Sequence, residues 1–279
     1  MKPSYLEKIK NIPPIYCVTL ESSYERRKKL EKEIDIPINY VYFKKYSEYN
    51  YEIEGNLTHE LAEWSKGPVL SHLFINEYWL QNTNHEYVLI IEDDLSLETL
   101  SYWNFTWEDF INKLPEDWEC IQLSIIRDQV FENLSLKFRK RQIFDYGAQI
   151  YLIKRSYAIK LYSYYHLKDK KLSINLPLIT IRIDNDEIIP YNQVTSYNEN
   201  TCQLNVIPFV ENVIFSSIGT VYNIPLFVEN IEMPSEACNK NDYSENSETY
   251  FNCHQISHNH VIELWKNKGR YMTIQNFFI

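Results

Sequence analysis

The stretch Tyr87-Val88-Leu89-Ile90-Ile91-Glu92-Asp93-Asp94 places a mostly apolar run directly before three acidic residues. An apolar run without polar alternation is typical of a strand buried on both faces, as in a parallel sheet. Ligands of open α/β sheets bind beyond the carboxyl ends of the strands, where these three carboxylates would lie. The stretch therefore predicts both the fold class and the edge of the sheet at which chemistry takes place.

The segments on either side of this strand predict strands that alternate with helices. Ser22 and Ser23 offer N-caps to the first of these helices. This alternation indicates a three-layer α/β sandwich with a mainly parallel, Rossmann-like sheet. The predicted strands cover residues 15–20, 38–43, 87–91, 118–123 and 147–153, and the predicted helices cover 24–33, 58–81, 106–114 and 156–164.

The end of the chain differs in composition. Residues 236–248 are polar and poor in large aliphatic side chains, which favours a loop or linker, and residues 256–267 favour a short helix. We therefore expect two parts: a main domain over residues 1–222 and a C-terminal extension over residues 223–279.

Composition excludes several classes of protein. The 279 residues carry a formal net charge of −10 and no long basic block, which argues against a nucleic-acid partner. Five scattered cysteines fit a reducing compartment better than a disulfide scaffold. Neither a signal peptide nor a transmembrane segment is recognisable, so we expect a cytoplasmic protein, bacterial or in the host cytoplasm of a virus.

Three adjacent carboxylates repel one another unless a cation compensates them. Mg²⁺ or Mn²⁺ suits such oxygen ligands and also bridges the phosphates of a nucleotide diphosphate. Asp after a strand also commonly caps the following segment, which is the structural alternative for Asp93 and Asp94. The apolar strand that precedes them favours the metal.

Two further clusters have open interpretations. Residues 184–187, Asp-Asn-Asp-Glu, also follow an apolar run, so Asp186 is either a general base for an acceptor hydroxyl or part of a surface turn. Cys253, His254, His258 and His260 are dense but fit no structural zinc spacing. A solvated tail is the simpler interpretation, with a histidine that folds back to a catalytic metal as the alternative.

Several segments, taken in order, resemble glycosyltransferase family 25, which includes lipopolysaccharide, lipooligosaccharide and collagen hydroxylysine galactosyltransferases. The resemblance spans residues 14–220, and its most specific motif is Glu92-Asp93-Asp94 after an apolar lead-in. The segments that carry it are Val18-Thr19-Leu20 with Glu25-Arg26-Arg27, Gly67-Pro68-Val69-Leu70-Ser71-His72-Leu73, Ile90-Ile91-Glu92-Asp93-Asp94-Leu95, residues 147–153 with Ala158, Asp186-Glu187-Ile188-Ile189, and residues 208–212 with 216–218.

This resemblance implies a GT-A-like fold and an inverting, Mn²⁺-dependent (or Mg²⁺-dependent) transfer from a UDP-sugar, typically UDP-galactose, to a hydroxyl of a glycan or glycoprotein. It also implies roles for individual residues. Asp94 and Asp93 would bind the metal, with Glu92 and Asp93 supporting the metal or the ribose; Asp186, or Asp184 in its place, would be the base; and Thr19, Leu20, Arg26, Arg27, Ser71 and His72 would line the donor site.

Two alternatives remain open. The fold could persist as a catalytically degenerate module that binds nucleotide sugars or glycans, because Asp184-Asn185 changes the surroundings of the predicted base. A structural protein with a tyrosine-rich surface would explain the 23 tyrosines but not the acidic strand end.

Overall fold

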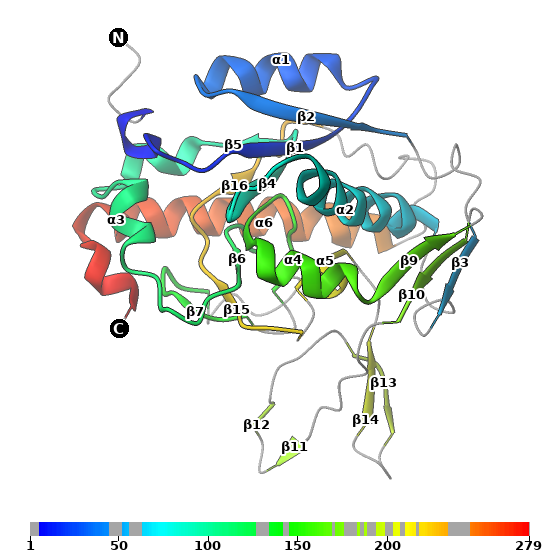
Figure 1. Ribbon diagram of the computed structural model, residues 1–279. Helices are drawn as coiled ribbons and strands as arrows, with labels where there is room; N and C mark the ends of the chain where they lie inside the picture. The colour runs from blue at the N-terminus through cyan, green and yellow to red at the C-terminus, as the bar shows by residue number, and fades with distance from the viewer. Residues whose placement is uncertain are drawn as a thin grey trace.

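A seven-stranded mixed sheet, with strand order β2-β1-β4-β8-β6-β15-β7, forms the centre of the molecule (Figure 1). The computed structural model describes residues 6–44, 52–55, 63–126, 134–141, 145–168, 171–175, 183–184, 187–188, 194–198, 203–206, 210–215, 218–233 and 246–278. The strands of the central sheet are β1 (Ile15–Leu20), β2 (Ile38–Phe43), β4 (Tyr87–Glu92), β6 (Cys120–Gln122), β7 (Arg139–Lys140), β8 (Ile150–Lys154) and β15 (Val221–Asn223).

Smaller sheets and helices surround this centre. The remaining strands are β3 (Glu52–Gly55), β5 (Leu95–Ser96), β9 (Tyr165–Lys168), β10 (Lys171–Ile174), β11 (Ile183–Asp184), β12 (Glu187–Ile188), β13 (Val194–Asn198), β14 (Gln203–Val206) and β16 (Val228–Glu229). The α-helices are α1 (Tyr24–Glu33), α2 (Glu63–Asn82), α3 (Trp107–Ile111), α4 (Arg155–Tyr162), α5 (Val210–Ile214) and α6 (Asn246–Asn267), and the 3-10 helices are η1 (Leu6–Ile9), η3 (Glu98–Tyr102), η5 (Gly269–Tyr271) and η6 (Ile274–Phe278).

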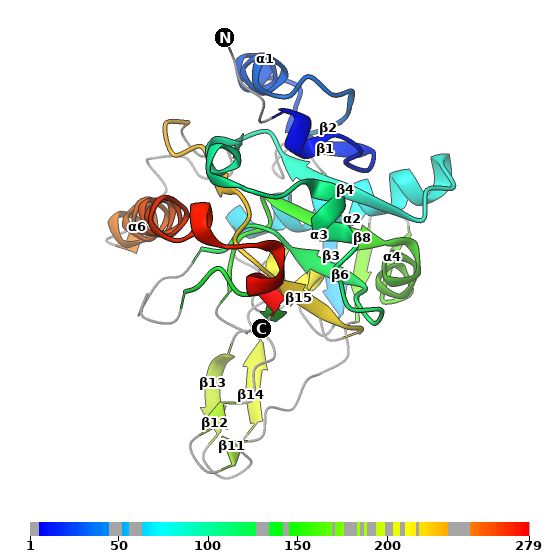
Figure 2. The ribbon, with the colours of Figure 1, turned by 90° about the vertical axis from the view of Figure 1, so that its left-hand side faces the viewer.

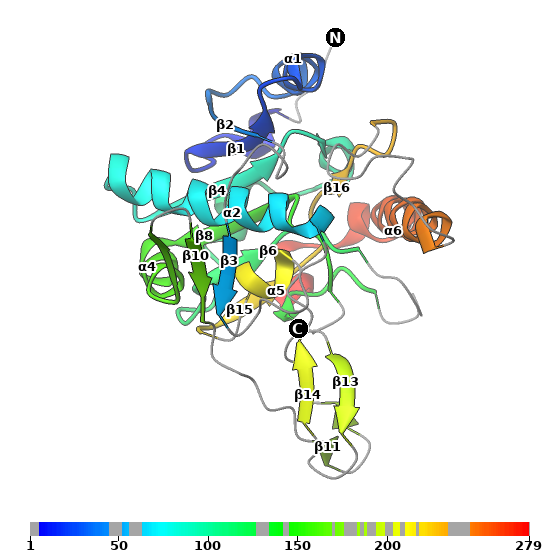
Figure 3. The same cartoon turned by 90° about the vertical axis from the view of Figure 1, so that its right-hand side faces the viewer.

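Both faces of the sheet are buried, which confirms the three-layer α/β arrangement. On β4, Leu89 and Ile91 pack into one core with residues of η1, α1, α3 and α6, whereas Val88 and Ile90 pack into the other with residues of α2, α4 and α5. Figures 2 and 3 show α6 on one side of the sheet and α4 on the other. The period of two along the strand divides the apolar run between the two layers of helices.

Five of the seven strands run in the same direction, as predicted, and β8 and β7 run against them, which makes the sheet mixed. The β1–β2, β1–β4 and β6–β15 pairs are parallel, but β8 runs antiparallel to both of its neighbours, β4 and β6, and β7 runs antiparallel to β15. A parallel return needs a long crossover, usually a helix. The described part of the connection from β6 to β8 contains β7 and no helix.

The C-terminal helix is longer than we expected and forms part of the core. It covers 22 residues, and its buried Trp265 lies 6.1 Å from Trp103 and 5.7 Å from Phe277 between ring centroids. Leu226 and Phe227 of the preceding segment belong to the same apolar cluster as strands β1 and β4. Residues on both sides of position 222 therefore share one core.

Replacing Trp265 by alanine tests this shared core. We expect the free energy of unfolding to fall by about 3–5 kcal/mol, the usual cost of deleting a buried tryptophan side chain. Tyr271→Ala is the matched control, because the Tyr271 side chain is 83% exposed. A denaturant titration in which both variants retain the wild-type midpoint would contradict the packing of α6 into the core.

Candidate functional site

The candidate site lies where the sheet topology changes direction. The chain leaves β1 through α1 to β2 on one side, and β4 pairs with β1 on the other side. Ligands of open α/β sheets bind at such a point, outside the carboxyl ends of the strands. The parallel register pairs Val18 with Glu92, so Thr19 and Asp93 follow at the same edge.

Asp93 is held by two groups from the first β-α unit. The Thr19 hydroxyl donates to Asp93 Oδ2 at 2.5 Å, and Arg26 Nε lies 2.9 Å from Asp93 Oδ1. The Asp93 side chain is only 6% exposed. Both of its carboxylate oxygens are therefore engaged by the protein itself.

Arg26 bridges the two aspartates. Arg26 Nη2 lies 2.6 Å from Asp94 Oδ2, so one guanidinium offsets charge on both carboxylates. Arg26 lies in the first turns of α1, directly after the carboxyl end of β1, which explains its reach to the end of β4. The structure thus brings together four residues that the sequence predicted for one site.

Arg27 has a different role, because it fixes the turn between β1 and α1. Its guanidinium donates to Thr19 Oγ1 at 3.1 Å, to the Glu21 carbonyl at 3.0 Å and to the Leu20 carbonyl. The residue is buried. These bonds hold the turn that follows β1, and they place the predicted donor-site residues Thr19 and Leu20.

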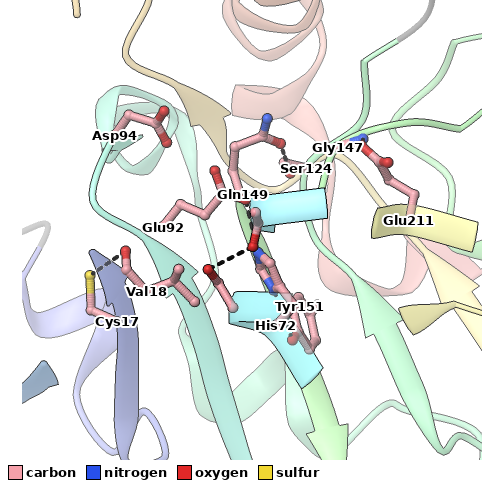
Figure 4. Close-up of polar contacts among 12 residues, drawn as sticks. Cys17, Val18, His72, Glu92, Asp94, Ser124, Gly147, Gln149, Tyr151 and Glu211 are labelled. Carbon is pink, nitrogen blue, oxygen red and sulfur yellow. Dashed lines mark hydrogen bonds and ion pairs between the residues drawn. The ribbon is translucent and has the colours of Figure 1, made fainter. Parts of the chain in front are cut away.

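A buried histidine of α2 orients the Glu92 side chain. His72 on α2 has Nε2 at 2.9 Å from Glu92 Oε1 and Nδ1 at 3.1 Å from the Tyr151 hydroxyl, to which Asn76 also donates. Figure 4 shows Glu92, Gln149, His72 and Tyr151 together at this end of β4 and β8. Burial by itself raises the pKa of Glu92, but the hydrogen bond with His72 and nearby Arg26 and His254 outweigh it, so this pKa is lowered.

Asp94 has the opposite electrostatic balance. Burial, together with Glu92, Glu229 and Asp93, raises its pKa to about 8 against the opposing effect of Arg26. Its Oδ1 atom is buried without a hydrogen-bond partner among the described residues. Buried polar atoms are normally paired, so this oxygen marks a candidate position for a ligand.

The tail is not solvated at His254: this residue of α6 folds back beside Asp94, as the alternative interpretation allowed, and sequence reasoning missed the acid with which it pairs, Glu229. Glu229 Oε1 lies 2.5 Å from His254 Nδ1, and the backbone N–H of Asn230 donates to the Asp94 carbonyl at 2.6 Å. Burial lowers the pKa of His254, but the hydrogen bond and charge of Glu229, with Asp94 and Glu211, outweigh it and raise this pKa. The available signal was the spacing of His254 and His258, which places them on one helix face.

The remaining predicted residues are placed differently. Ser71 donates to the Gly67 carbonyl at 2.8 Å within its own helix. Asp184 belongs to β11, which lies away from β1 and β4 in all three ribbon views (Figures 1, 2 and 3). Asp186 falls outside the described residues. The structure therefore does not bring Asp184 to the acidic strand end.

The described protein side chains do not by themselves supply enough ligands for the predicted metal site. No group of three or more His, Cys, Asp or Glu side chains in the described ranges is arranged to hold a metal ion. Asp93 is engaged by Thr19 and Arg26, which leaves Asp94 Oδ1 as the available buried oxygen. A site with one protein carboxylate fits Mg²⁺-type ions that take their other ligands from substrate phosphates and water.

Comparison with known proteins adds little to this geometry. No family model matches the chain, and no curated protein matches it. One solved structure with a similar course of the chain is described as "Crystal Structure of A197 from STIV", with 7% sequence identity, a TM-score of 0.39, and coverage of 78% of this chain and 83% of that chain. A likeness at this level does not establish a family or an activity.

The described helices show no membrane-spanning segment, since none is both long and apolar enough to cross a bilayer.

The raised pKa of Asp94 predicts how stability changes with pH in the metal-free protein. The unfolded carboxyl ionises near the ordinary value of 3.8 and the folded one near 8, so the folded state binds more protons between these values. Stability is therefore expected to fall as pH rises from about 4 to 8. Chemical denaturation of Asp94→Asn across this range should show a smaller fall in the free energy of unfolding. If this free energy falls as steeply with pH in the variant as in the wild type, the raised pKa does not belong to Asp94.

Proposed function

We propose that the chain is a glycosyltransferase that takes a hexose, galactose being the first candidate, from a UDP-sugar and transfers it with inversion to a glycan or protein hydroxyl. The observation that carries the proposal is the Thr19–Asp93–Arg26–Asp94 arrangement at the switch point of the sheet. This arrangement has a fixed carboxylate, the cationic Arg26 and an Asp94 oxygen that is buried with no hydrogen-bond partner in the described part of the chain. All three lie at the edge where α/β proteins bind ligands.

The donor diphosphate would lie against the Arg26–Asp94 ion pair. Arg26 Nη2 lies 2.6 Å from Asp94 Oδ2, and a phosphate oxygen would replace that contact, because guanidinium groups form strong charge-assisted hydrogen bonds with phosphate. Asp94 would hold a Mn²⁺ or Mg²⁺ ion, which when bound neutralises charge on the departing diphosphate. Asp93 would position Arg26 rather than bind the ion, since Thr19 and Arg26 engage its oxygens.

The transfer step needs a base for the acceptor. The acceptor oxygen loses its proton to a carboxylate and bonds to the anomeric carbon as the bond from that carbon to the diphosphate oxygen breaks. Asp186, which lies outside the described residues, stays our predicted base; Asp184 lies on β11, away from the acidic strand end, and is not placed to take this role. His72 would keep the Glu92 carboxylate turned toward the donor through its 2.9 Å contact.

A second candidate function is a module that binds nucleotide sugars without turnover. Two observations favour it: Asp93 is engaged by the protein, and the described residues contain no three-ligand metal group. Release of UDP that depends on an added acceptor would exclude this candidate. Slow release of UDP without acceptor would not, because water can also accept the sugar.

Thermal stability measured against a panel of nucleotide sugars tests the donor site. With Mn²⁺ present, one UDP-sugar should raise the apparent midpoint by mass action, and EDTA should abolish the rise. Asp94→Asn should lose the shift while remaining folded. If no donor at saturating concentration moves the wild-type midpoint, the proposed function fails.

Arg26→Gln tests the diphosphate contact. We expect the affinity for UDP with Mn²⁺ to fall about ten-fold or more, as for the loss of a charge-assisted contact. Lys29→Gln is the matched control, because it removes the same charge from α1, and Lys29 pairs within the described ranges with the exposed Glu232 at 3.3 Å rather than with Asp93 or Asp94. Equal affinities of the two variants in isothermal titration would reject a specific role for Arg26.

A further inference from the structure

An exposed aromatic ring lies at the same edge of the sheet as the proposed donor site. Tyr42 is the penultimate residue of β2, pairs in register with Thr19 and is 55% exposed. Strand β2 is the end strand of the central sheet. Tyr42 therefore flanks the carboxyl end of β1 on the side opposite to Asp93 and Asp94.

The Tyr42 ring is held in place although it is exposed. The guanidinium carbon of Arg27 lies 5.0 Å from its centroid, and the Tyr40 ring lies 6.5 Å away. Arg27 is itself fixed by its bonds to Thr19 and to the carbonyls of Leu20 and Glu21. An aromatic surface held in advance loses little side-chain freedom when a ligand covers it.

The spacing across the sheet matches a nucleotide. Two strand separations, about 9.5 Å, lie between β2 and β4, with β1 in the middle. A nucleoside diphosphate has its base and its diphosphate on either side of the ribose. With the diphosphate at Arg26 and Asp94, the ribose would pass over Thr19 and Leu20, and the base would reach Tyr42.

We propose that Tyr42, held by Arg27, is the surface on which the nucleobase of a nucleoside diphosphate stacks. This inference rests on the proposed function, because the position of the diphosphate orients the nucleotide. Stacking on an aromatic side chain tolerates every base, since each has a π face. Tyr42 therefore supplies affinity for the base, and the choice among bases depends on other contacts.

Isothermal titration of UDP, CDP, ADP, GDP and inorganic pyrophosphate, each with Mn²⁺, separates the base from the phosphates. Tyr42→Ala should weaken binding of the nucleotides about 5- to 100-fold, the range for loss of one stacked base. Pyrophosphate affinity should stay within about two-fold, as should nucleotide affinity in Tyr42→Phe, which keeps the ring.

Tyr78→Ala is the matched control. Tyr78 is 46% exposed, and its ring lies 6.4 Å from that of Tyr16, near the opposite end of β1, so nucleotide affinity should not change.

Unchanged nucleotide affinity in Tyr42→Ala overturns the proposal, and so does an equal loss of pyrophosphate binding. If the wild type binds none of the nucleotides, the donor site and the stacking surface both fail. The wild type could also bind nucleotides in a way that depends on Tyr42 and yet transfer no sugar. That result would support the stacking surface and contradict only the proposed transferase activity.

Discussion

Compensation of two adjacent carboxylates is the constraint on which the site depends. Asp93 and Asp94 follow a buried strand, where like charges in a low dielectric are costly. The Thr19 hydroxyl and the Arg26 guanidinium relieve part of that cost, and both come from the first β-α unit. Three local features therefore position Asp93 and Asp94 together: the parallel β1–β4 pair, the turn fixed by Arg27 and the start of α1.

The negative charge of the two aspartates is only partly compensated by the protein, and this remaining imbalance at Asp94 suggests a functional site. Asp94 retains a raised pKa and a buried oxygen without a partner among the described residues, although Arg26 contacts its other oxygen. Glu92, one residue earlier, has a lowered pKa through its contact with His72. Neighbouring carboxylates whose environments drive their pKa values apart are typical of sites that bind cations or exchange protons.

The second half of the molecule supports the site in a way that the family resemblance does not suggest. The segment after position 222 contributes Trp265, Leu226 and Phe227 to the main core, and it places Glu229 and His254 beside Asp94. The antiparallel strand β8 contributes Tyr151, which completes the hydrogen bonds of His72. Distant parts of the chain thus define the electrostatics of one strand end.

The sequence by itself determined the α/β class, the bounds of β1, α1 and β2, and the acidic strand end, because apolar periodicity and helix signals are local properties. The resemblance to glycosyltransferase family 25, rather than any local pattern, implied that Thr19, Arg26, Asp93 and Asp94 belong to one site. Only the tertiary structure decided the direction of β8, the packing of α6 into the core, the capture of Asp93 by Thr19 and Arg26, and the approach of His254 to Asp94. These depend on which strands become neighbours and how the connections return. Contacts between residues far apart in the chain, such as Thr19 and Asp93 at a separation of 74 positions, leave no periodic trace in the sequence.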